Sequence, residues 1–134
     1  MKVPPMLLLD TCALIWLVED LDSLGSSAKS SIAGNPDSLH ISAISALEIS
    51  LLAAKKRIIL PMEPFKWYSE AIKLHGITEL PVTGEIAALS GKLPVIHKDP
   101  CDRIIIATAI LKRMKVLTAD DVFRKYDAVK VVWS

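Results

Sequence analysis

Two aspartates stand where predicted strands of this 134-residue chain end. Asp10 directly follows the apolar run at residues 6–9, and Asp120 directly follows the segment "KVLTA". In open α/β sheets, ligands bind beyond the carboxyl ends of the strands. One such aspartate is a common loop or cap residue, but two of them predict a cleft lined by carboxylates.

A third acid, Glu48, lies on or beside the apolar face of a predicted helix. Apolar residues recur at helical spacing over residues 43–57, at Ile44, Leu47, Leu51 and Ala54. A carboxylate buried without a partner is strongly destabilising. The sequence therefore predicts a positive partner for Glu48, either a lysine or arginine side chain or a bound cation.

Asp99 and Asp102 belong to the segment "HKDPCDRIIIATA" at residues 97–109. With Pro100 at the first helical position, Asp99 is the predicted N-cap, and the Asp102 carboxylate can reach back to it in a capping box. The apolar run that follows indicates a helix buried on most sides, so its first-turn acid faces into the domain. We predict that Asp102 binds a metal. His97 is expected to be a loop or packing residue, because magnesium prefers oxygen ligands.

The four acids Asp10, Glu48, Asp102 and Asp120 come from separate predicted elements and are expected at one edge of the sheet. Converging carboxylates raise each other's pKa unless a cation binds between them. Ligands that are all oxygen favour Mg²⁺ or Mn²⁺ over zinc. One or two such ions can activate a water for in-line attack on a phosphodiester. The hypothesis is metal-assisted phosphodiester hydrolysis.

Predicted strands and helices alternate along the chain. The strands are predicted at residues 6–9, 39–42, 77–83, 115–120 and 129–133. The helices are predicted at residues 11–18, with Trp16 and Leu17 turned inward, and at 26–32, 43–57, 64–74, 84–93 and 100–114, followed by a helical turn at 122–126. This alternation predicts an α/β fold of three layers around a mostly parallel sheet. No linker divides residues 1–134, so a single domain is expected.

Composition limits the classes of protein that fit this chain. Hydrophobic residues make up 51% and the mean hydropathy is +0.40, which indicates strands buried on both faces or an extra interface with a partner. No apolar stretch reaches the roughly 20 residues of a membrane span, and a charge follows within ten residues of Met1. We therefore expect no membrane segment, no signal peptide and a cytoplasmic location. Cys12 and Cys101 lack zinc-site spacing and are expected to be small buried residues.

The charge balance excludes a globally basic nucleic-acid binder, because the net charge is only +1. Any contact with nucleic acid must then be local. Two basic clusters are available, Lys55, Lys56 and Arg57 and, later in the chain, Lys112, Arg113 and Lys115. Each cluster can equally be the favourable positive charge at a helix C-terminus.

Four segments resemble, in order and spacing, the PIN-domain ribonucleases, and in particular the VapC-type toxins of bacterial and archaeal toxin–antitoxin pairs. They are "LLLDTCALIWL", "ISAISALEIS", "HKDPCDRIIIATA" and "VLTAD". The resemblance implies a PIN fold, with a parallel sheet of four to five strands between helices and an acidic magnesium pocket that cuts RNA. It also implies a homodimer and a small antitoxin protein that holds the nuclease inactive.

The resemblance also implies roles for individual residues. The catalytic and metal-binding acids of the family are matched by Asp10, Glu48, Asp102 and Asp120. Supporting positions are matched by Thr11, Asp99, Thr118 and Asp121, the last of which leaves the fourth acid ambiguous by one residue. Candidate contacts to RNA phosphates are Arg103, Lys55, Lys56 and Arg57. Close relatives commonly carry other non-acidic residues at Cys12, Leu47 and Cys101, which leaves the metal site intact.

Three other classes of protein compete with this interpretation. A signalling receiver domain also gathers acids around magnesium, but it needs an aspartate at the end of its third strand, and "ITELPVT" has none. A haloacid-dehalogenase-like phosphatase needs Asp-x-Asp after the first strand, where this chain reads "DTC". A non-catalytic PIN-like module that acts through protein contacts is disfavoured by the four intact acids.

Overall fold

A parallel sheet of five strands forms the centre of the protein in a computed structural model that describes residues 5–134. The strands are β1 (Leu7–Leu9), β2 (Leu39–Ser42), β3 (Thr78–Leu80), β4 (Lys115–Leu117) and β5 (Lys130–Val132). Their order in the sheet is β3-β2-β1-β4-β5, and every neighbouring pair is parallel. The predicted α/β fold is confirmed. The first four residues, which contributed to the expectation of no signal peptide, lie outside the described part.

The central strand β1 is buried on both faces, as its uninterrupted leucines predict. Leu7 and Leu9 point into one core and Leu8 into the other. The chain leaves β1 for β2 on one side of the sheet and returns later to β4 on the other side. The carboxyl end of β1 is therefore a point where the strand order reverses, which is the usual place for a ligand in such sheets.

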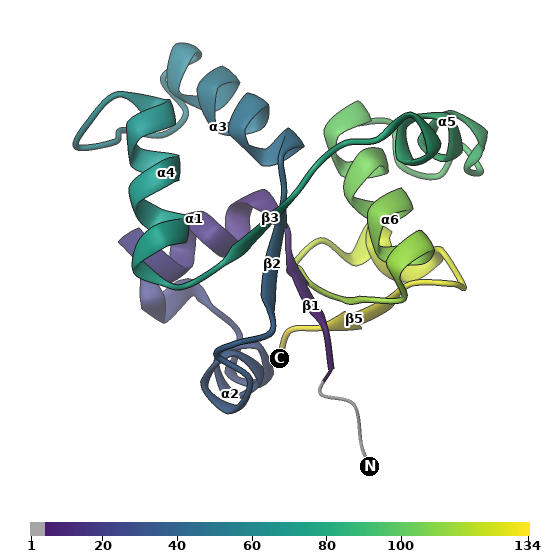
Figure 1. The fold of residues 1–134 in the computed structure, drawn as a ribbon, viewed down its shortest axis with the longest axis horizontal. Helices are drawn as coiled ribbons and strands as arrows, with labels where there is room; N and C mark the ends of the chain where they lie inside the picture. Colours follow the sequence, from purple (N-terminus) through teal and green to yellow (C-terminus); the bar gives the residue numbers. More distant parts are fainter. Residues whose placement is uncertain (1–4) are drawn as a thin grey trace.

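Helices cover both faces of the sheet, so the fold has three layers (Figure 1). One face carries α1 (Thr11–Glu19), α2 (Ser26–Gly34), α3 (Ile44–Ala54) and α4 (Pro64–Leu74). The opposite face carries α5 (Gly84–Lys92), α6 (Pro100–Lys112) and the short 3₁₀ helix η2 (Asp121–Lys125). A second 3₁₀ turn, η1 (Leu21–Ser23), joins α1 to α2. None of the helices within residues 5–134 is long and apolar enough to cross a membrane.

The predicted start and stop signals hold for several helices. Asp99 caps α6 and Pro100 occupies its first turn, while Gly76 adopts a φ of 62° just after α4. The predicted helix at residues 43–57 is too long, because α3 ends at Ala54 and Lys56 adopts a left-handed φ of 57°. The basic triplet therefore follows α3 and does not form its last turn.

Candidate active site

The four predicted acids meet at the carboxyl edge of the sheet. Asp10 follows β1, Asp120 follows β4, Glu48 comes from α3 and Asp102 from the first turn of α6. They line one pocket of about 270 Å³, together with Thr11, Cys12, Trp16 and Ala119. The convergence expected from the positions of the strand ends is therefore present in the fold.

Asp10 is held rigidly and is almost completely buried, with 7% of its surface exposed. Its Oδ1 accepts the backbone N–H of Ala13 at 2.8 Å, which caps α1, and its Oδ2 accepts the hydroxyl of Thr118. Burial raises the pKa of Asp10 to about 6, even though both hydrogen bonds act in the opposite direction. Thr118 also accepts the backbone N–H of Asp120 at 3.0 Å, so one hydroxyl ties two of the acids together.

Glu48 has a hydroxyl partner and no cationic one. It accepts a hydrogen bond from Thr11, whose hydroxyl also lies 2.9 Å from that of Ser45. Among residues 5–134, no lysine or arginine forms an ion pair with Glu48. Burial raises its pKa, and the hydrogen bond from Thr11 opposes that rise. Of the two partners that the sequence allowed, a lysine or arginine side chain is not found among the described residues.

Asp99 caps the start of α6 and Asp102 faces the pocket, but the two do not form the predicted capping box. Oδ1 of Asp99 accepts the backbone N–H groups of Cys101 at 2.8 Å and Asp102 at 3.3 Å. The backbone N–H of Asp99 donates to Nδ1 of His97 at 3.3 Å, and not to Asp102 as the capping box required. The Asp102 carboxylate is turned into the pocket instead. Burial, followed by the charges of the neighbouring acids, raises its pKa to about 8.

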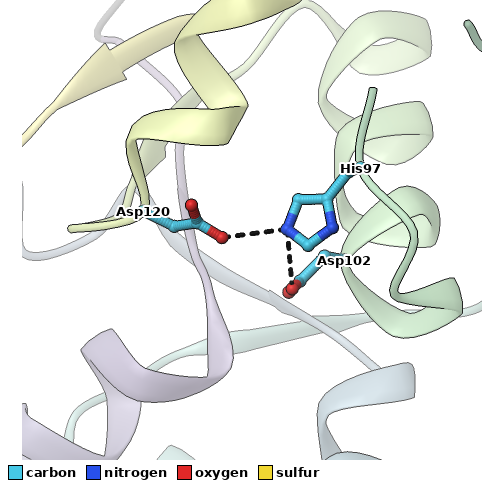
Figure 2. Close-up of side chains that lie close together, drawn as sticks. All are labelled: His97, Asp102 and Asp120. Carbon is cyan, nitrogen blue, oxygen red and sulfur yellow. Dashed lines mark hydrogen bonds and ion pairs between the residues drawn. The ribbon is translucent and has the colours of Figure 1, made fainter. Parts of the chain in front are cut away.

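His97 lies in a loop and packs edge-on against Phe123, as predicted, but it also has a role beside the acids that the prediction missed. Its Nε2 lies 2.9 Å from Oδ2 of Asp120 and 3.1 Å from Oδ2 of Asp102, so the ring stands between two acids of the site (Figure 2). Because Nδ1 accepts the Asp99 N–H, the proton of a neutral ring is on Nε2, where it donates to Oδ2 of Asp120 and lies close to Oδ2 of Asp102. In this tautomer His97 orients the acids and has no Nε2 lone pair for a metal.

Arg103 was a candidate contact to RNA phosphates, and the structure places it elsewhere. All five donors of its guanidinium bind backbone carbonyls in the α5–α6 connection, at Ser90, Leu93, Pro94 and His97. The hydroxyl of Tyr126 binds the same segment, because it accepts the N–H of His97 at 2.9 Å and donates to Pro94 at 2.8 Å. Arg103 therefore holds the loop that carries His97 and has no free donor for a phosphate.

Replacing Arg103 with alanine is expected to lower the free energy of unfolding by about 3 kcal/mol, since four backbone carbonyls, most of them part-buried, lose their donors. The RNA cleavage that the resemblance implies should fall about 10- to 100-fold, because His97 is no longer fixed. Chemical denaturation and a cleavage assay measure the two effects. Arg103→Lys serves as the control, since one ammonium cannot satisfy all of these carbonyls. Unchanged stability combined with weaker RNA binding would restore the phosphate-contact role.

Of the other predicted supporting residues, the two threonines contact the acids of the pocket and Asp121 does not. Thr11 and Thr118 contact the acids, as described above. Asp121 does not, because its side chain is 93% exposed and lies 3.9 Å from Arg124, so Asp120 is the acid that faces the pocket. Cys101 is buried as expected, whereas Cys12 is exposed, contrary to the prediction. Although Cys12 keeps an exposed surface, partial desolvation of its thiol in the pocket and the charges of the surrounding carboxylates raise the thiol pKa, which disfavours a nucleophilic thiolate.

The side chains of the pocket fit a divalent cation of the magnesium type. Among the described residues, two groups of side chains have ligand atoms within 4.8 Å of one another. One group is Glu48 and Asp102 with the cap residue Asp99, and the other is Asp102 and Asp120 with His97, while Asp10 is in neither group. Asp102 belongs to both groups. The pKa values of Asp10, Glu48 and Asp102 are raised because each carboxylate is desolvated and lies close to other negative charges. A cation bound among them would relieve both costs, and carboxylate oxygens are the ligands that Mg²⁺ and Mn²⁺ take.

Comparison with known proteins agrees with this geometry. The PIN domain family model matches residues 7–129. The chain is 31% identical over 120 residues to Ribonuclease VapC22 of Mycobacterium tuberculosis, which covers 89% of this chain and 90% of that protein.

Solved structures show the same fold. A toxin–antitoxin complex from Klebsiella pneumoniae has 27% identity and a TM-score of 0.61, and the match covers 91% of this chain and 93% of that one. VapBC2 from Rickettsia felis, bound to a DNA fragment from its promoter, has 14% identity and a TM-score of 0.71, with 96% and 99% covered. The four acids, the parallel sheet and these similarities lead to one conclusion: the chain belongs to the PIN domain family, and within that family it resembles the VapC-type ribonuclease toxins.

Proposed function

We propose that the protein is a magnesium-dependent endoribonuclease that hydrolyses RNA phosphodiester bonds, with Mn²⁺ as a possible substitute. The observation that carries the proposal is the convergence of Asp10, Glu48, Asp102 and Asp120 in one pocket without an arginine or lysine partner among the described residues. The similarity to Ribonuclease VapC22 supports RNA as the substrate.

The four acids would hold the cation, and the residues around them would keep the acids in place. When bound, a divalent cation supplies charge that stabilises the phosphoryl oxygens and activates a water for in-line attack. Thr118 fixes the carboxylate of Asp10, Thr11 fixes that of Glu48, and His97 fixes those of Asp102 and Asp120. Such fixing matters because a site loses activity when its ligands drift by about an ångström.

The direct test is a cleavage assay on a structured RNA in MgCl₂, with EDTA as one control and Asp10→Asn as the inactive variant. Cleavage is expected to need magnesium and to be lost in Asp10→Asn. Asp121→Asn is the matched control, because it removes the same charge from an acid that is 93% exposed and outside the pocket. Cleavage that survives EDTA or Asp10→Asn would rule out the metal-carboxylate mechanism. A blank with every RNA would favour the non-catalytic PIN-like module.

We propose that RNA approaches the pocket along the groove beside Glu48. This groove of about 450 Å³ is lined by the basic side chains Lys55 and Arg57 as well as by Leu47 and Leu51. Lys56 was also a predicted contact, but it lines a different pocket, together with Ile58 and Ile59.

Replacing Lys55 and Arg57 together with glutamine is expected to raise the KM for RNA about 10-fold and leave kcat nearly unchanged. The slope of log binding constant against log salt concentration should become shallower by about two, one for each lost phosphate contact. Binding titrations at several salt concentrations measure this slope. The matched control replaces Lys112, the last residue of α6, and Lys115, the first residue of β4, neither of which lines this groove. An unchanged slope would assign the triplet to a structural role.

We also propose that the protein is a toxin that pairs with a small antitoxin protein and forms a homodimer. The Klebsiella structure is itself a toxin–antitoxin complex, which supports the antitoxin. Several large apolar side chains are exposed in this chain, including Ile59 at 94%, Leu74 at 76% and Phe65 at 63%. Such surface accounts for the apolar excess of the composition. Co-purification with the product of an adjacent gene and light scattering test the two partners separately.

A further inference from the structure

Trp16 packs against the core, as the sequence pattern predicted, and it also lines the proposed catalytic pocket. Its side chain is half-buried and lines the pocket together with the four acids. Cys12 and Trp16 are four residues apart on α1, so they lie on the same face of that helix. That face forms the wall of the pocket, and α1 begins at Asp10 itself.

The ring of Trp16 is supported from behind. Its centroid lies 5.6 Å from that of Trp133, with the two ring planes tilted by 54°. Trp133 is anchored in turn, because its backbone carbonyl accepts the N–H of Ala28 at 2.9 Å. The carbonyl oxygen also comes so close to Gly25 that a Cβ there would lie 2.1 Å from it. A rigid aromatic plane therefore stands at the edge of the pocket.

Packing alone does not account for Trp16. Trp67 shows what a structural tryptophan looks like in this fold, since it is 2% exposed and its indole N–H donates to Glu19 at 2.7 Å. Trp16 packs one side against the core and leaves part of its surface open to a pocket of charged groups. Within residues 5–134, its indole N–H forms no hydrogen bond. With a cation bound among the acids to attract a phosphate, an apolar ring beside them suits a ligand that has both a phosphate and an aromatic group.

We propose that Trp16 is a substrate-positioning residue that stacks on an unpaired nucleobase next to the phosphate to be cut. This inference rests on the proposed ribonuclease function and specifies its substrate as a single-stranded segment. Bases in single strands stack on aromatic side chains, whereas bases inside an A-form helix are already stacked on each other. The stack would fix the neighbouring phosphate relative to Asp102 and Asp120, and it would exclude paired nucleotides from the pocket.

The experiment compares two ten-nucleotide RNA probes, oligoadenylate and an oligomer of the same length with abasic central positions. Binding is measured by fluorescence anisotropy in MgCl₂, with every protein carrying Asp102→Asn so that the probes stay intact. The protein with Trp16 is expected to bind oligoadenylate about 5- to 100-fold more tightly than the abasic probe. Trp16→Ala should bind both probes alike, and Trp16→Phe should keep most of the preference. Cleavage of oligoadenylate by otherwise unmodified Trp16→Ala should show a raised KM.

Thermal melting shows whether Trp16→Ala is folded. If it is not, tryptophan fluorescence provides a second measurement of stacking. Stacking on adenine should quench part of the tryptophan fluorescence, and Trp16→Phe should remove that quenching while the fold is retained. The proposal is overturned if Trp16→Ala keeps the parent's full preference for oligoadenylate, or if Trp16→Phe keeps the parent's fluorescence quenching. It is also overturned if the parent itself shows no preference. Either result leaves RNA cleavage by the unmodified protein untouched. Absence of both binding and cleavage with any RNA would instead defeat the ribonuclease proposal itself.

Discussion

Asp102→Asn is expected to reduce RNA cleavage by about 1,000-fold or more and to leave the fold intact. The substitution removes the charge of the one carboxylate that belongs to both ligand groups of the pocket. Losing a single group that stabilises developing charge costs about 100- to 1,000-fold, and the loss of a shared ligand should be at the upper end or beyond. Single-turnover cleavage assays at saturating MgCl₂ measure the effect.

Asp99 provides the matched comparison, because it lies three residues away on the same helix turn. Asp99→Asn should keep most of the activity, since asparagine caps helices about as well as aspartate. Asp99→Ala should lower the free energy of unfolding by about 1 kcal/mol because two backbone N–H groups lose their acceptor. If Asp99→Asn abolished cleavage while Asp102→Asn did not, the roles of the two residues would have to be exchanged.

The affinity for Mn²⁺ is expected to fall about 100-fold between pH 8 and pH 6 in isothermal titration calorimetry. Protons compete with the cation for carboxylates, and the pKa of Asp102 is raised to about 8 in the metal-free protein. One competing proton changes the affinity by up to about tenfold for each pH unit. Below pH 6 the loss should steepen, because the pKa of Asp10 is about 6. Asp102→Asn should flatten the profile above pH 6, whereas a flat profile in the unmodified protein would contradict the raised pKa.

The same pKa shifts also make the stability of the metal-free protein depend on pH. Stability falls as the pH rises, whereas the affinity for Mn²⁺ increases. Both aspartates have ordinary pKa values of 3.8, so above pH 4 the unfolded chain has lost protons that the folded metal-free protein still holds. Their contribution to stability is therefore greatest below pH 4 and is lost as the pH rises through about 6 and then about 8. Thermal melting in EDTA should show this decline. Magnesium added at pH 8 should reverse it, because the cation replaces the missing protons.

Features of the fold that depend on one helix or strand could be predicted from the local sequence. The run of leucines in β1, the aspartates after β1 and β4, and the Asp99–Pro100 start of α6 each fix their own surroundings, and the structure has all three as expected. The end of α3 was misplaced, because nothing in the local pattern forces Lys56 into a left-handed conformation.

The roles of His97 and Arg103 could not be read from the sequence, because they depend on contacts between distant segments. His97 meets Asp120 across 23 positions, and the position of Asp120 depends on the pairing of β4 with β1. Arg103 looked like a phosphate ligand because arginine beside an acidic motif commonly is one. Only the path of the α5–α6 connection, which curls around its guanidinium, shows that its donors are used internally.

Because Arg103 binds only main-chain oxygens, the exposed side chains of the loop that it holds can change without breaking any of these hydrogen bonds. The same freedom offers a route for measurement. Val95 is 82% exposed and contributes no carbonyl to the guanidinium, so a fluorophore attached there through an introduced cysteine would report movements of the loop as cation and RNA bind.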